Sequence, residues 1–471
     1  MRGAAGIQFG SKYLSLALQL LITMALARLI SPDDFGVLAI VVVFLAFFNM
    51  FANMGIGTAI VQFQDLTARD HGALFMFTFL VAIILSAAFC AASPLISAIY
   101  GRAELVPLCC LGSLSLFFST LNTVPNGVLL RDKDFIAIGL RQVVTTLAAG
   151  VVAILLSLLG WGAYALVLQS AIQAAAVLAW NLIRHPIRQL NWHFIAPLKK
   201  VFSYSAYQLG FSVINYFSRN LDNLLIGGFM GATSLGYYDR AYKLTTYPMT
   251  AISSVAASVV QPYMAEHQNN PKRIFEAWLK ITKLISLVAA PIAVLFFCSA
   301  TEIIAILFGD QWDASVPLFQ ALAISVYFQM VNNTSGSFYQ SLGRTDLLFT
   351  NGLIDTAITA IAIMAGVLSG DLLVVAILVS IAYCLHTLPV ILLLVRKAFG
   401  EPLQSLLLFV PEVLIALVSG AICSALGAVI PSLGAIDIVW KIACIAIAVG
   451  IGYKATGQFG HIAAALGRSV D

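Results

Sequence analysis

Charge is what this sequence has least of. Only 10% of its 471 residues are Asp, Glu, Lys or Arg, while 61% are hydrophobic. Soluble domains usually contain about 25% charged residues, so the composition excludes an ordinary soluble protein and indicates a polytopic membrane protein. The net charge of +4 is small, and no basic run alternates with aromatic residues. The charge therefore gives no sign of a nucleic-acid partner.

Motifs for catalysis and metal binding are also missing. The sequence has no GxxxxGK[ST] loop, no HExxH motif and no Cys/His cluster, and its seven cysteines show no CxxC spacing. The longest polar gaps, 184–200 and 265–277, are too short to form an independent domain. We therefore expect a protein that is not an enzyme, with no catalytic residues, no cofactor and no metal.

Apolar stretches long enough to cross a bilayer dominate the chain. About 20 residues of helix span the roughly 30 Å of hydrocarbon, and we predict fourteen such helices in an all-α fold. The predicted spans are 5–30, 36–61, 72–99, 105–130, 136–159, 162–183, 202–230, 236–263, 279–308, 315–341, 347–368, 372–395, 404–430 and 436–456.

The distribution of Lys and Arg predicts the orientation. With fourteen spans, nineteen of the 25 basic residues fall on the side of the N-terminus, five fall on the other side, and Arg219 lies within a span. Cytoplasmic loops carry the excess of Lys and Arg. We therefore expect both termini on the cytoplasmic side of the membrane.

The sequence repeats itself. Gln8–Phe9–Gly10 corresponds to Gln208–Leu209–Gly210, and the turn that ends at Gly36 corresponds to the turn that ends at Gly236. The offset of 200 residues rises to about 212 where the segment around Arg131 matches the segment around Arg344. An even number of helices per copy predicts two six-helix lobes, 1–200 and 201–400, related by a pseudo-twofold along the membrane normal. Residues 401–471 then add two helices and a short tail.

The segment 202–230 contains an arginine and an aspartate at a depth where charge is costly. Arg219 lies eleven residues from Met230, or roughly 16 Å at 1.5 Å per residue, close to the midplane. Charged residues at this depth usually face a bundle interior or a watery cavity. Arg219 could bind an anionic substrate, or it could pair with Asp222, three residues away, and only tether the helix to a neighbour.

Four further charges lie in or near the predicted spans. Arg28, Arg141 and Lys12 are candidates for substrate binding, although each is close enough to a helix end to serve as an interfacial anchor. Asp355 has no cation nearby in the sequence. It is a candidate coupling site for a proton or cation, with a protonated, hydrogen-bonded core residue as the alternative.

Two segments resemble a known family. The stretch ALARLISPDDFGVLAIVVVFLAFFNMFANMGIGTAIVQ and the stretch RNLDNLLIGGFMGATSLGYYDRAYKL are similar to oligosaccharide flippases of bacterial polysaccharide export. The similarity extends to the colanic acid exporter branch of the multidrug/oligosaccharidyl-lipid/polysaccharide superfamily. The resemblance implies a V-shaped cavity between two lobes, with the family's cationic site at Arg28 and Arg219 and its aspartate at Asp222.

The resemblance also implies a function. Such a flippase moves undecaprenyl-pyrophosphate-linked oligosaccharide from the cytoplasmic to the periplasmic leaflet by alternating access, for exopolysaccharide, O-antigen or capsule assembly. Expected partners are this lipid, membrane lipids, a coupling H⁺ or Na⁺, and polysaccharide polymerases and glycosyltransferases. The alternatives are a cation-coupled multidrug exporter of the same superfamily and a membrane-embedded polymerase or acyltransferase. The latter needs a long loop or a catalytic dyad, and neither is evident in the sequence.

Overall fold

The computed structural model describes residues 2–53, 55–195, 198, 216, 219–266, 270–430 and 434–460. These residues form helices, turns and loops and contain no strand. The chain divides into two compact units, Met1–Gly236 and Tyr237–Asp471. The predicted lobes, which divide at 200, rest on the internal repeat and stay a prediction.

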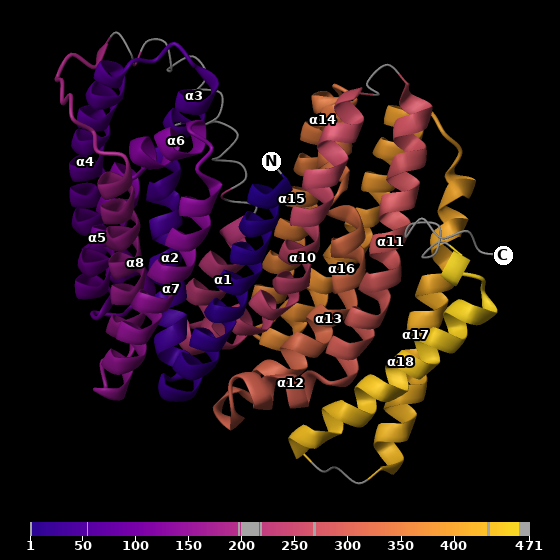
Figure 1. Ribbon diagram of the computed structural model, residues 1–471. Coiled ribbons are helices and arrows are strands. Elements are labelled where there is room, and N and C mark those ends of the chain that lie inside the picture. The colour runs from indigo at the N-terminus through magenta and orange to yellow at the C-terminus, as the bar shows by residue number, and fades with distance from the viewer. Residues whose placement is uncertain are drawn as a thin grey trace. The chain divides into compact units, whose positions relative to one another are not determined.

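The first unit is a bundle of long helices and two short ones (Figure 1). Its helices are α1 (Arg2–Leu29), α2 (Pro32–Asn53), α3 (Ile56–Gln62), α4 (Ala68–Tyr100), α5 (Leu105–Leu121), α6 (Thr123–Arg131), α7 (Phe135–Leu158) and α8 (Ala163–Arg184). A further helical stretch covers 219–230. The next helix, α10 (Ala232–Glu266), begins in this unit and continues into the second.

Local signals in the sequence explain where the first helices begin. Ser31 accepts a hydrogen bond from the backbone N–H of Asp34 at 3.2 Å, and Pro32 opens α2. Thr67 and Asp70 form a reciprocal capping box at the start of α4. Capping side chains satisfy N–H groups that the first turn leaves unpaired, and proline fits the first position because it has no N–H.

The second unit has the same kind of helices and ends with two more. After α10 come α11 (Pro271–Cys298), α12 (Ala300–Leu307), η1 (Asp310–Trp312), α13 (Ser315–Asn332), α14 (Ser335–Ser341), α15 (Thr345–Leu368), α16 (Leu372–Ile391), η2 (Leu392–Phe399), η3 (Leu403–Phe409), α17 (Val410–Val429), η4 (Gly434–Ile436) and α18 (Asp437–Ala455). The α17 and α18 helices, yellow in Figure 1, pack against each other and against α11.

Eleven helices among the described residues are long and apolar enough to cross a membrane. The predicted all-α membrane fold is confirmed. The predicted span 202–230 lies largely outside the described residues, and α10, which covers 236–263, is not among the eleven. The predicted span 315–341 is divided, because α13 ends at Asn332 and α14 begins at Ser335. The total of fourteen spans stays a prediction.

The two units repeat one succession of helices. The α7 and α15 helices each contain 24 residues, and α5 and α13 begin at Leu105 and Ser315. Gly160 follows α7 with φ 81°, and Gly370 follows α15 with φ 72°. All these positions are 210 residues apart, and the offset of about 212 near Arg131, which comes from matching residues, stays a prediction.

Candidate functional site

A cavity of about 350 Å³ lies in the first unit between α1 and α7. Six of its nine lining residues are polar. The lining consists of Ser11, Lys12, Ser15, Leu16, Gln19, Ile138, Gly139, Gln142 and Thr146. We call this space the α1–α7 cavity. Lys12 is among these residues, and its expected role in substrate binding stays a prediction.

Helix geometry produces the cavity. On α1 its polar residues recur at 11, 15 and 19, and on α7 its lining recurs at 138, 142 and 146. Residues four apart share a helix face, so each helix presents one stripe to the other. One turn further along, the helices approach closely, because a Cβ at Gly150 would lie 2.2 Å from the Cδ1 of Ile22. This contact closes one end of the cavity.

Part of the hydrogen-bonding capacity in the cavity wall is unused. The Ser15 hydroxyl is buried and has no hydrogen-bond partner among the described residues. Thr146 accepts a hydrogen bond at 3.1 Å from Gln173, which approaches from α8. A buried polar group without a partner costs free energy, so the Ser15 hydroxyl is available to a ligand or to water.

The residues transferred from the family resemblance lie in different environments. Arg28, in the last turn of α1, and Arg219 are exposed, while Asp222 is only 7% exposed. Whether Arg219 pairs with Asp222 or binds an anion stays a prediction. The backbone N–H of Asn223 donates to the Asp222 carboxylate at 2.8 Å.

Arg141 lies inside the first unit and does not line the α1–α7 cavity. Its Nη1 donates to Asn126 Oδ1 at 3.0 Å and to Asn181 Oδ1 at 2.8 Å, and Asn181 in turn donates to Asn122 at 2.7 Å. The Nε of Arg141 is buried without a partner among the described residues. This network links α6, α7 and α8, so its evident contribution is to hold those helices together.

A cluster of three charges on α10 was not recognised from the sequence. Asp239 and Arg240 are 4% and 7% exposed, and Arg240 Nη2 lies 2.7 Å from Asp239 Oδ2. Lys243 Nζ lies 2.9 Å from the same oxygen, with 43% of its side chain exposed. The Asp239 carboxylate is thus shared by two cations. The i, i+4 spacing of Asp239 and Lys243 was the signal in the sequence.

Asp355 has a partner that the sequence did not suggest. His386 on α16 places its Nδ1 3.3 Å from the Asp355 Oδ1 on α15. The side chain of His386 is 12% exposed and that of Asp355 is 36% exposed. The two residues are 31 apart in the chain, and the packing of α15 against α16 brings them together.

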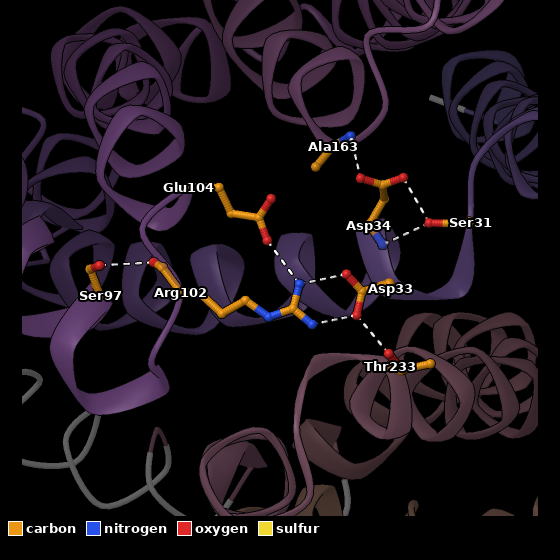
Figure 2. Close-up of polar contacts among 8 residues, drawn as sticks. All are labelled: Ser31, Asp33, Asp34, Ser97, Arg102, Glu104, Ala163 and Thr233. Carbon is orange, nitrogen blue, oxygen red and sulfur yellow. Dashed lines mark hydrogen bonds and ion pairs between the residues drawn. The ribbon is translucent and has the colours of Figure 1, made fainter.

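Asp33 connects two distant segments of the first unit (Figure 2). Arg102 donates to both oxygens of the Asp33 carboxylate at 2.6 Å, and the Thr233 hydroxyl also donates to it at 2.6 Å. Arg102 donates to Glu104 as well, at 2.9 Å. The hydrogen bond with Asp33 is the main cause of the raised pKa of Arg102. A bidentate arginine–carboxylate pair holds both groups in a fixed orientation.

The segments 31–36 and 231–236 also contact each other directly; we call this contact the turn crossing. A Cβ on Gly36 would lie 1.7 Å from the carbonyl oxygen of Ala232, and a Cβ on Gly236 would lie 2.0 Å from that of Pro32. Both positions therefore require glycine, which lets two backbones approach closely. The two contacts are reciprocal and 200 residues apart, as the internal repeat predicts.

Comparison with known proteins identifies the family to which the chain belongs. Residues 25–317 match the family model described as "Polysaccharide biosynthesis protein". The match covers more than half of the 471 residues. The chain belongs to this family. The resemblance to polysaccharide transport proteins, inferred from the sequence, is thereby confirmed.

Two curated relatives show how far the similarity of this polysaccharide biosynthesis protein extends. It is 28% identical over 339 residues to the teichuronic acid biosynthesis protein TuaB of Bacillus subtilis, covering 70% of this chain and 69% of TuaB. It is 23% identical over 371 residues to the lipopolysaccharide biosynthesis protein WzxC of Escherichia coli, covering 76% and 74% of the two chains.

A solved structure of similar fold aligns with almost the whole chain. The structure of the lipid II flippase MurJ in an inward closed conformation superposes with a TM-score of 0.78. The alignment covers 96% of this chain and 98% of MurJ, at 15% identity. At this identity the similarity establishes the fold.

Proposed function

We propose that this protein flips an undecaprenyl-pyrophosphate-linked oligosaccharide repeat unit across the bacterial inner membrane, from the cytoplasmic to the periplasmic leaflet. The observation that carries the proposal is the polar α1–α7 cavity between two long apolar helices. Polar and ionisable residues within membrane helices often mark a substrate path. The family and the printed names of its relatives, which concern teichuronic acid and lipopolysaccharide, support a saccharide substrate made by glycosyltransferases and used by a polymerase.

Basic side chains on the helices support an anionic head group. In the first unit, Lys12, Arg28 and Arg219 are exposed on helical segments. In the second unit, Lys243 is partly exposed beside the Asp239–Arg240 pair. A pyrophosphate carries about two negative charges, and arginine binds phosphate oxygens bidentately. The lipid tail remains in the bilayer while Arg28 and Arg219 of the first unit bind the pyrophosphate.

Replacing Arg219 with alanine is expected to abolish surface polysaccharide without lowering the amount of protein. The substitution removes an exposed charge from a membrane helix, so the fold loses little while the pyrophosphate loses a bidentate contact. The measurement is cell-surface polysaccharide at matched protein level. Arg188→Ala, which removes an exposed arginine outside the spans, is the control. Normal export by well-expressed Arg219→Ala protein would refute the binding role of Arg219.

We assign Asp355 and His386 to ion coupling. Their 3.3 Å contact joins two neighbouring membrane helices of the second unit and includes the one side chain type that changes charge near neutral pH. Export coupled to H⁺ or Na⁺ needs a site whose occupancy changes the preferred conformation. A carboxylate beside a histidine provides such a site for either ion.

Asp355→Asn protein in liposomes is expected to lose the acceleration of flipping that an imposed H⁺ or Na⁺ gradient gives the wild type. Binding of the lipid-linked substrate should change little, because the substitution is nearly isosteric. Asp346→Asn is the matched control, since Asp346 begins the same helix and pairs with Arg344 on the exposed surface. Full gradient dependence in Asp355→Asn would exclude the coupling role.

A further inference from the structure

We infer that the α1–α7 cavity binds a sugar ring of the lipid-linked substrate and that the pyrophosphate binds elsewhere. This inference rests on the proposed flippase function and assigns one part of the substrate to one set of residues. The cavity of about 350 Å³ falls within the roughly 300–1,000 Å³ of small-molecule sites. The inference concerns which chemical group fits its wall.

The composition of the wall favours hydroxyl groups over phosphate. Five of its six polar residues are uncharged serine, glutamine or threonine, and Lys12 is the only cation among the lining residues. A pyrophosphate needs several positive charges to replace its hydration. A sugar ring both donates and accepts hydrogen bonds all around its edge, and hydroxyl and amide side chains can do the same.

The arrangement of the wall also fits a ring. Gln19 and Gln142 come from opposite helices, so each helix contributes one amide to the wall. The Gln142 amide also donates to the Thr146 hydroxyl at 3.5 Å. The buried Ser15 hydroxyl, without a partner among the described residues, adds an unused donor and acceptor. The Ile22–Gly150 contact limits the depth of the cavity. A sugar inserted between the helices would satisfy these polar groups while the rest of the glycan extends outward.

The test compares two ligands on the purified full-length protein. One ligand is undecaprenyl pyrophosphate carrying the repeat unit that accumulates when this protein is depleted, and the other is undecaprenyl pyrophosphate alone. The double variant Gln19→Ala/Gln142→Ala is expected to bind the glycolipid at least about tenfold more weakly, since it loses two amide contacts. Its affinity for undecaprenyl pyrophosphate should equal that of the wild type, which also shows that the variant is folded.

Two controls sharpen the comparison. Gln64→Ala, an exposed glutamine that donates only to the nearby Val61 carbonyl, should leave both affinities unchanged. If Lys12 contacts the sugar, Lys12→Gln should lower the affinity for the glycolipid more than the affinity for undecaprenyl pyrophosphate. An equal loss for both ligands in the glutamine double variant or in Lys12→Gln would place the pyrophosphate in the cavity and overturn the inference.

The remaining outcomes are also decisive. Unchanged glycolipid affinity in the double variant would show that the cavity does not recognise the sugar. Wild-type protein that binds neither ligand would refute the flippase function itself. Wild-type protein that binds undecaprenyl pyrophosphate as tightly as the glycolipid would keep that function and reject only the sugar site. Failure of the inference and failure of the proposed function are therefore distinguishable.

Discussion

Oxidation of an Asp33→Cys/Thr233→Cys variant is expected to stop polysaccharide export, and a reducing agent is expected to restore it. The wild-type side chains are in direct contact, with a hydroxyl–carboxylate hydrogen bond of 2.6 Å, and a disulfide between cysteines here requires a Cβ separation of about 3.5–4.5 Å. The bond would join the two halves of the turn crossing covalently. If alternating access opens the protein at this contact, the crosslinked form cannot complete a cycle.

The same variant in reduced form shows whether the loss of export is due to the disulfide or to destabilisation by the substitutions. The reduced protein loses the Arg102–Asp33 ion pair, whose side chains are about one-third exposed, so its stability should fall only modestly. Ser93→Cys supplies the matched crosslink, because Ser93 lies 3.8 Å from the native Cys110 across α4 and α5. That bond should leave export intact. Export by the fully oxidised Asp33→Cys/Thr233→Cys protein would show that the turn crossing stays closed during transport.

The helices were largely predictable because apolar length is a strong signal in a membrane protein. The interruptions within the predicted helices were not predicted from the sequence. The predicted span 105–130 contains two helices that meet at Asn122, and the predicted span 279–308 is interrupted at Ser299. Pro125 lies in the first turn of α6, and its missing N–H and its ring end the preceding helix. No proline or glycine lies at Ser299, and that interruption is not visible in a hydropathy pattern.

The candidate site was predictable only in part, for a similar reason. Lys12 could be identified because a lysine in an apolar helix is conspicuous by itself. The partner of Asp355 could not, because His386 approaches from another helix. The same holds for Arg141, whose amide partners come from two neighbouring helices. A single sequence identifies costly residues but not the tertiary contacts that stabilise them.

Two ion pairs hold the two C-terminal helices. In one pair the bundle supplies the cation, and in the other the C-terminal helix supplies it. Lys283 of α11 pairs with Glu412 of α17, and both side chains are almost completely buried. Lys441 of α18 pairs with Glu302 of α12 at 2.5 Å. Glu412 and Glu302 thus fix α17 to α11 and α18 to α12.

Lys283→Met is therefore expected to destabilise the protein severely, by about 3–5 kcal/mol, because it leaves the carboxylate of Glu412 buried without its cation. The lysine also donates to the Leu408 carbonyl and lies 5.9 Å from the centre of the Phe409 ring. The measurement is the thermal unfolding midpoint of the purified protein in detergent. Glu412→Leu, which leaves the lysine unpaired, should have an effect of similar size.

The double variant Lys283→Met/Glu412→Leu decides what the ion pair contributes. Replacing both charges of a buried pair by apolar side chains is often neutral or stabilising, so the double variant should recover most of the stability that either single variant loses. The exposed Arg344–Asp346 pair provides the control, because its removal should hardly change the midpoint. Additive losses in the double variant would mean that the two residues act independently and that no buried pair holds α17 in place. Recovery would show that the pair specifies the position of α17 without being needed for its stability, since apolar residues would pack there equally well.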